Sequence, residues 1–198
     1  MKFTLAIVAV IAGYTWVLAS RTPREVAHVV TFAVLALCAW RPARRGEWGL
    51  RRPEFLPALR AAVWVTAAAV ALISASGWAA GTLQQRWRWT SLAFLVPWAA
   101  GQQFALQTVL LREAQAVSGR RRGIALAALV FGALHLPNPF LAPVTLVASL
   151  VWCLLYDRHP NWLPLAFSHA LSTLAILHSF DDDVTGHLRV GYAYLLLD

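Results

Sequence analysis

The chain has 198 residues, of which 59% are apolar and only 13% are charged, and its mean hydropathy is +0.58. Soluble domains carry about 25% charged residues, so this composition excludes an ordinary soluble globule. The net charge of +8, from 17 Lys and Arg against 9 Asp and Glu, favours an anionic partner. At this hydropathy we expect the partner to be a bilayer containing anionic lipid, and we expect no nucleic acid.

Seven apolar segments follow one another along the chain, at residues 3–19, 26–40, 56–80, 91–111, 123–136, 140–156 and 162–179. Several of them reach the roughly 17–25 residues that a helix needs to cross a bilayer. None alternates between apolar and polar residues with a period of two. The sequence therefore predicts an all-α, polytopic transmembrane helix bundle with about seven spans, organised as a single membrane domain over residues 1–198.

The first and last apolar stretches each leave a choice open. Residues 3–19 follow Lys2, and Val17-Leu18-Ala19 suits a signal-peptide cleavage site. The length of this stretch and the arginines that follow at Arg21 and Arg24 favour a retained first span over a cleaved signal peptide. The apolar tail at residues 190–197 is too short to cross a bilayer, and we expect it to lie on the surface or to fold back.

The distribution of basic residues predicts the orientation of the spans. With seven spans, twelve of the 17 Lys and Arg side chains fall on one side and five on the other. Cytoplasmic loops carry the excess of basic residues, so the N-terminus and the even-numbered loops are expected in the cytoplasm. We expect the basic clusters to contact anionic lipid, and the protein to be integral to a bacterial inner (plasma) membrane.

Three groups of polar residues lie inside the apolar segments, where polar side chains are costly and usually face a partner or a cavity. The groups are Gln102, Gln103 and Gln107; Phe131, His135 and Asn138; and His169 and Thr173. Gln103 and Gln107 are four residues apart, as are His169 and Thr173, so each pair shares one face of a regular helix. Because the groups reach similar depths, we predict one polar cluster formed by three helices. The alternative is that each group supplies interhelical hydrogen bonds worth about 1 kcal/mol.

The order and spacing of these residues resemble the CPBP family (CAAX protease and bacteriocin-processing, or Abi, membrane proteins), which includes the CAAX endopeptidases. The family pattern is EExxxR, then FxxxH, then HxxxN or HxxxD, on three membrane helices. Residues 131–135 match the second motif, and residues 169–173 match the third with Thr173 in place of Asn or Asp. The first motif falls on residues 102–107, about 33 residues before His135. The resemblance covers roughly residues 91–179.

The chain departs from this family at the first motif. Gln102 and Gln103 stand where the family has its two glutamates, and Gln107 stands where it has arginine. In the family the first glutamate is taken to activate the attacking water, whereas an amide cannot accept a proton at neutral pH. Glu113, at the cytoplasmic edge of its span and about 22 residues before His135, is not expected to replace it.

In the family the histidines are taken to bind or stabilise the developing oxyanion. In this chain we expect His135, His169 and Gln102 to be catalytic, and we assign to substrate binding or orientation Gln103, Gln107, Phe131, Asn138 and Thr173. Two histidines and neutral amides are a poor set of ligands for zinc, which prefers histidine, cysteine and carboxylate. We therefore expect no metal and no cofactor.

Three functions remain open at this point. The first is a hydrolase-type endopeptidase that cleaves a membrane-associated or lipidated substrate by a variant mechanism, and the resemblance favours it. The second is a non-proteolytic membrane enzyme that acts on an isoprenoid, carotenoid or lipid substrate by isomerase-like or cyclase-like acid–base chemistry of His135 and His169. The third is a non-catalytic membrane partner.

Overall fold

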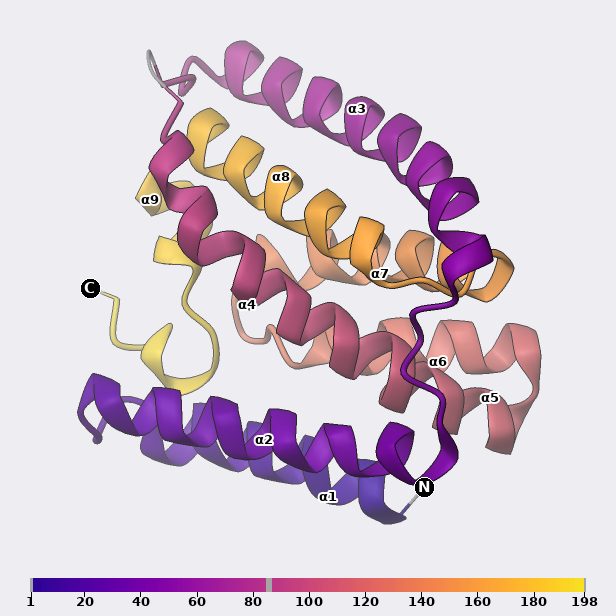
Figure 1. The fold of residues 1–198 in the computed structure, drawn as a ribbon. Helices are drawn as coiled ribbons and strands as arrows, with labels where there is room; N and C mark the ends of the chain where they lie inside the picture. The colour runs from indigo at the N-terminus through magenta and orange to yellow at the C-terminus, as the bar shows by residue number, and fades with distance from the viewer. Residues whose placement is uncertain (1, 85–86, 198) are drawn as a thin grey trace. The chain divides into compact units, whose positions relative to one another are not determined.

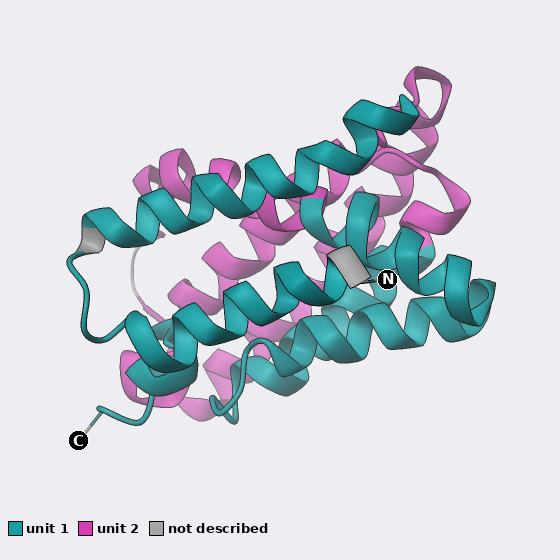
Figure 2. Cartoon of the chain, turned by 90° about the horizontal axis from the view of Figure 1, so that it is seen from below, with its two compact units in different colours: residues 1–48, 105–154, 186–198 teal, residues 49–104, 155–185 magenta. Residues whose placement is uncertain are grey.

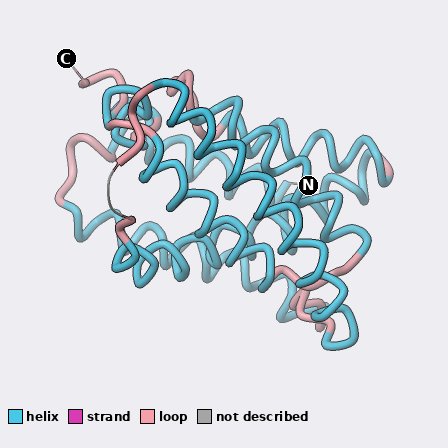
Figure 3. Tube along the Cα trace, turned by 90° about the horizontal axis from the view of Figure 1, so that it is seen from above, coloured by secondary structure: helices cyan, strands magenta, loops and turns pink. Residues whose placement is uncertain are grey.

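The computed structural model describes residues 2–84 and 87–197. Its α-helices are α1 Lys2–Gly13, α2 Arg24–Arg45, α3 Phe55–Ala80, α4 Leu92–Phe104, α5 Arg112–Ser118, α6 Arg120–Ala133, α7 Leu141–Arg158, α8 Leu163–Ser179 and α9 Asp182–Thr185 (Figure 1). Within the described residues the only β-type pairing is an isolated bridge between Leu50 and Asn161. Figure 3 shows this part of the chain as helices joined by loops. The predicted all-α class is confirmed.

Two π-helical segments extend the regular helices. The segment η1, Tyr14–Leu18, follows α1, and η4, Ala105–Leu111, follows α4. With these included, each of the seven predicted apolar segments coincides with a helix. The short helix α5 was not predicted. The helix α6 ends at Ala133, before the predicted end at residue 136. Pro137 disfavours the helical conformation of the residue before it, and helices usually end at or before that residue.

Several helices have the length and surface of membrane-embedded elements. In the described part of the chain, the segments long and apolar enough to cross a membrane are Glu25–Arg45, Arg52–Ala80 and Leu141–Arg158; shorter apolar helices span Thr4–Leu18 and Leu163–Ser179. On α3 the side chains of Trp64 and Leu72 are 78% and 70% exposed. A lipid environment accommodates such apolar surface, so the chain is an all-α membrane protein, and the number of its spans stays a prediction.

The chain divides into two compact units, shown in different colours in Figure 2. Unit 1 comprises residues 1–48, 105–154 and 186–198, and unit 2 comprises residues 49–104 and 155–185. The single membrane domain over residues 1–198 stays a prediction. Within unit 1 the backbone N–H of Gly191 donates to the carbonyl of Leu136 at 2.8 Å. The C-terminal tail therefore folds back onto the turn between α6 and α7, which is one of the two arrangements expected for it.

Unit 2 is built around α8, which packs against both α3 and α4 (Figure 1). The contact with α3 depends on Gly77, because a Cβ atom there would overlap the carbonyl oxygen of Ser179 and lie 2.6 Å from its Cβ. The hydroxyl of Thr82 donates to the same carbonyl at 2.7 Å. On the other side, the small residues Ala99 of α4 and Ala170 of α8 belong to one buried apolar cluster. These close approaches fix the helix that carries His169.

Candidate functional site

Gln103 of α4 and His169 of α8 form a buried polar contact within unit 2. The Nε2 atom of Gln103 lies 3.4 Å from Nδ1 of His169, and the two residues are 0% and 9% exposed. Gln103 continues the stripe of Leu95 and Ala99 at a spacing of four residues, so the packing of α4 against α8 brings it to the imidazole. An amide nitrogen donates, so Nδ1 of His169 accepts, and in a neutral imidazole Nε2 then carries the proton.

A second polar contact lies beside His169. The hydroxyl of Thr66 on α3 lies 2.7 Å from the hydroxyl of Ser168 and 2.6 Å from the carbonyl of Ala62. Both hydroxyl-bearing residues are buried. The contact ties α3 to α8 at the residue next to His169. No motif in the sequence marks Thr66, whose partner lies 102 positions away in the chain.

His135 lies in unit 1, in the turn that follows α6, and not on the helix predicted for it. Its Nδ1 is 2.7 Å from the carbonyl oxygen of Phe131, and the two rings are 5.0 Å apart at an interplanar angle of 50°. A carbonyl oxygen only accepts, so Nδ1 donates. In a neutral imidazole Nε2 therefore carries the lone pair. His135 and His169 thus hold their ring protons on opposite nitrogens.

Asn138 is fully buried and hydrogen-bonded within unit 1. Its Oδ1 accepts from the backbone N–H groups of Phe140 at 3.0 Å and Leu141 at 2.9 Å, and its Nδ2 donates to the carbonyl of Arg189 at 3.0 Å. The first of these bonds closes an Asx turn, which a short amide side chain favours. Asn138 therefore accepts from the first N–H group of α7 and holds the C-terminal tail at Arg189. Its predicted role in orienting a substrate stays a prediction.

Replacing Asn138 by alanine is expected to destabilise the protein by about 2 kcal/mol, because buried N–H and carbonyl groups lose their partners. The measurement is thermal unfolding in detergent. Asn138→Ser serves as a control, since its hydroxyl keeps the turn but does not reach Arg189, and we expect an intermediate loss. Equal midpoints for the wild type and Asn138→Ala would contradict the structural role assigned to this side chain.

Gln107 is fully buried in η4. The predicted shared face of Gln103 and Gln107 assumed a regular α-helix through residue 107, whereas the helix becomes π-helical at Ala105. Both side chains are fully buried, and their shared face stays a prediction. The remaining predicted residues, Gln102 of α4 and Thr173 of α8, are half-buried.

Arg41 of α2 contacts the same π-helical segment, also within unit 1. Its Nη1 donates to the carbonyl of Thr108 at 2.9 Å, and its Nε donates to Oε1 of Glu113 at 3.0 Å. From the sequence alone, Arg41 indicates only the orientation of the spans. A basic residue at the end of an apolar segment carries no indication of which carbonyl it binds.

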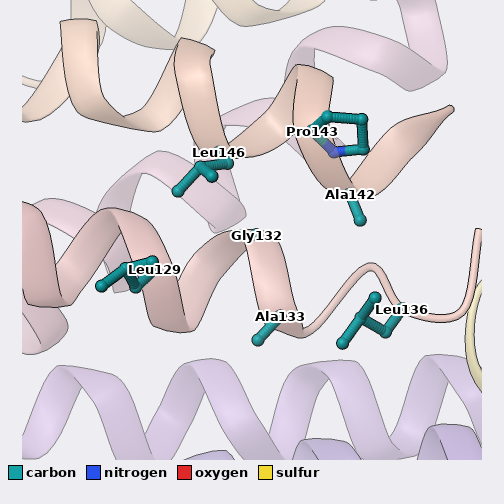
Figure 4. Close-up of a pocket in the computed structure, with 7 residues that line it drawn as sticks. All are labelled: Leu129, Gly132, Ala133, Leu136, Ala142, Pro143 and Leu146. Atoms are coloured by element: carbon teal, nitrogen blue, oxygen red, sulfur yellow. The ribbon is translucent and has the colours of Figure 1, made fainter. Parts of the chain in front are cut away.

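An apolar pocket of about 330 Å³ lies between α6 and α7 in unit 1 (Figure 4). It is lined by Leu129, Gly132, Ala133, Leu136, Ala142, Pro143 and Leu146. The two helices approach closely at Gly132, where a Cβ atom would lie 2.9 Å from Cβ of Leu146. Leu136 is the immediate neighbour of His135 in the chain. The turn that carries the imidazole therefore also forms part of an apolar wall.

The structure thus brings together Gln103 with His169 and Phe131 with His135. The predicted single cluster of all three polar groups stays a prediction. Across residues 2–84 and 87–197, no group of three or more His, Cys, Asp or Glu side chains is placed to hold a metal ion.

Comparison with known proteins gives one match. Residues 89–175 match the model of a family described as type II CAAX prenyl endopeptidase Rce1-like. The matched segment agrees with the range of 91–179 expected from the motifs, and it contains every predicted site residue. No curated protein and no solved structure matches the chain.

Proposed function

We propose that the chain, whose residues 89–175 match the model of the Rce1-like type II CAAX prenyl endopeptidases, is an intramembrane endopeptidase that cleaves a membrane-associated or lipidated substrate. The observation that carries the proposal is that the Nδ1 atoms of two histidines play different roles in their hydrogen bonds. Nδ1 of His135 donates to Phe131, whereas Nδ1 of His169 accepts from Gln103. The two imidazoles therefore hold their ring protons on opposite nitrogens.

In the proposed mechanism His135 replaces the missing carboxylate as the general base. Its Nε2 takes a proton from water while the water oxygen bonds to the scissile carbonyl carbon, and the carbonyl π electrons move onto the oxygen. The imidazolium then gives this proton to the departing nitrogen as the C–N bond breaks. Both transfers use the same nitrogen of His135, and such acid–base catalysis typically contributes about 10²–10⁴-fold.

His169 takes the role of oxyanion donor in this mechanism. Its Nε2–H donates to the carbonyl oxygen as negative charge develops there, and Gln103 holds the tautomer that places the proton on Nε2. We assign Gln102 to orienting the water by a hydrogen bond, because its amide accepts and donates but does not take a proton. Gln107 and Thr173 are assigned to binding the substrate.

The test uses the purified protein in detergent micelles and a lipidated reporter peptide with a C-terminal CAAX sequence. We expect the wild type to release a shortened peptide, detected by mass spectrometry, and we expect His169→Ala to lower kcat by about 10²–10³-fold, as the loss of one oxyanion donor does. His28→Ala, at an exposed position of α2, serves as the control and is expected to keep full activity. Absence of cleavage by the folded wild type would refute the proposal.

Restoring a carboxylate at the first motif is expected to raise the activity. Gln102→Glu supplies a base stronger than an amide next to the proposed water, and we expect at least a tenfold gain in kcat/KM, within the usual range for general-base catalysis. The matched control is Gln115→Glu on α5, whose side chain accepts from Arg112 at 3.3 Å. Unchanged or lower activity in a folded Gln102→Glu variant would contradict the water-orienting role.

A second function is favoured by the apolar pocket beside the His135 turn. A cavity of about 330 Å³ lined only by apolar residues suits part of an isoprenoid, carotenoid or other lipid chain. The two histidines would then move a double bond, one giving a proton to the chain and the other removing a proton from another carbon. Lipid extracts from hosts that express the wild type or His169→Ala discriminate between the functions, and identical profiles would exclude this one. If neither assay shows turnover, the non-catalytic partner remains.

The proposed setting of the enzyme is a bacterial inner membrane with the N-terminus in the cytoplasm. Arg120, Arg121 and Arg122 are exposed in the first turn of α6, and such basic clusters bind anionic lipid headgroups. A reporter fused to the N-terminus, assayed for protection from external protease, tests the orientation.

A further inference from the structure

We infer that Arg41 is a positioning residue, which holds the π-helical segment η4 and thereby fixes Gln107 in the site. Arg41 lies near the C-terminal end of α2, outside the segment that matches the family. The inference deepens the proposed function and rests on it for the activity readout alone.

The guanidinium of Arg41 makes two directed bonds. Nη1 donates to the carbonyl of Thr108, the residue after Gln107, and Nε donates to Glu113, which follows η4 in α5. The side chain of Arg41 is 9% exposed and that of Glu113 is 17% exposed, so both groups are largely removed from water. A third contact, with Glu47 at 3.6 Å, involves a side chain that is 60% exposed, and exposed pairs contribute little.

The packing of α2 directs Arg41 toward η4. The buried residues of α2 are Val34, Cys38 and Pro42, at intervals of four, and they form a single stripe. Arg41 lies three residues after Cys38 and therefore shares this side of the helix. The helix α2 also contacts η4 directly. The stripe thus ends in a cation that faces the π-helical segment.

Arg41 supplies the π-helical segment η4 with a hydrogen-bond donor from another helix. The hydrogen bonds of a π-helix run from each carbonyl to the residue five positions on, and such segments are rare and often occur at functional sites. A bond from a charged guanidinium is stronger than one between neutral groups. Arg41 binds the carbonyl of Thr108 inside η4 and the carboxylate of Glu113, two residues beyond the end of η4. Gln107 directly precedes Thr108 in the chain, so the bond from Arg41 restrains the backbone next to Gln107.

The chain offers a matched control for this role. Arg45 lies in the last turn of the same helix and is exposed. Replacing either arginine by glutamine removes the same charge from α2, but only Arg41→Gln breaks the bonds to Thr108 and Glu113.

The first experiment measures hydrogen–deuterium exchange of the backbone amides at residues 105–113 in the full-length protein in detergent. We expect Arg41→Gln to accelerate exchange there at least tenfold and Arg45→Gln to leave it unchanged, with exchange in α8 equal in both variants. Unchanged protection of residues 105–113 in a folded Arg41→Gln variant would overturn the inference.

The second experiment measures kcat and KM on the lipidated reporter peptide. We expect Arg41→Gln to raise KM at least tenfold with kcat within twofold, because Gln107 is assigned to binding the substrate. We expect Arg41→Lys to recover only part, because a single ammonium does not reproduce the fork of the guanidinium. Full recovery of exchange protection and KM by Arg41→Lys would show that charge alone suffices, which overturns the positioning role. If the wild type cleaves nothing, the proposed function fails while the exchange experiment still decides the inference. If the wild type cleaves but Arg41→Gln matches it in KM and exchange, only the inference fails.

Discussion

Replacing His135 by asparagine is expected to lower kcat on a lipidated reporter peptide by about 10²–10⁴-fold, the usual contribution of a general base. The asparagine amide keeps a donor near the position of Nδ1, so the hydrogen bond to the carbonyl of Phe131 persists. It lacks the basic nitrogen, so the proposed transfer of a proton from water stops. The measurement is steady-state kinetics on the purified variant, together with its thermal midpoint.

The control for this prediction separates loss of the base from loss of the turn. His135→Ala removes both the basic nitrogen and the bond to Phe131, so we expect it to lose activity and also to unfold at a lower temperature. His135→Asn is expected to lose activity while its thermal unfolding midpoint stays equal to that of the wild type. Activity within a factor of two of the wild type in His135→Asn would assign the base elsewhere.

Replacing Gly77 by alanine is expected to destabilise unit 2 by about 3 kcal/mol, at the upper end of the usual cost of overpacking. The added Cβ would overlap the carbonyl oxygen of Ser179 and lie 2.6 Å from Cβ of the same residue. Backbone atoms do not rotate out of the way as a flexible side chain does, and Thr82 already binds this carbonyl. The helices α3 and α8 must therefore move apart.

A second glycine in the chain supplies the matched control. Gly13 ends α1, and a Cβ atom there would meet nothing within 4 Å. Gly13→Ala is expected to leave stability unchanged or to raise it by up to about 1 kcal/mol, because alanine loses less backbone entropy in a helix. Unfolding in detergent with increasing SDS measures both variants. Equal midpoints for Gly77→Ala and Gly13→Ala would contradict the close contact of α3 and α8.

The positions of the helices follow closely from the sequence, because long apolar runs leave few alternatives in a membrane protein. Residues 56–80 were predicted as a span, and α3 runs from Phe55 to Ala80. The short helix α5 carries charged and polar residues and has no apolar period to mark it. The π-helical turn at Ala105–Leu111 was also missed, since hydropathy does not distinguish a π-helix from an α-helix.

Contacts in the candidate site could be predicted where the two residues are close in the chain or where both are motif positions. The contact of Phe131 with His135 follows from a spacing of four residues, and it is present. The contact of Gln103 with His169 joins two of the predicted motif positions across 66 residues. The bonds of Arg41 to Thr108 and of Asn138 to Arg189 cross 67 and 51 residues. Such pairs depend on which helix faces pack, and no pattern within either segment indicates the partner.

The most direct test of the central claim is hydrolysis of the lipidated reporter peptide in water enriched in oxygen-18. We predict a shortened peptide whose new carboxyl group carries one oxygen-18 atom after a single turnover, and no such product from His135→Asn. An intact peptide recovered from the folded wild type, or a product formed equally by His135→Asn, would contradict the proposed hydrolysis.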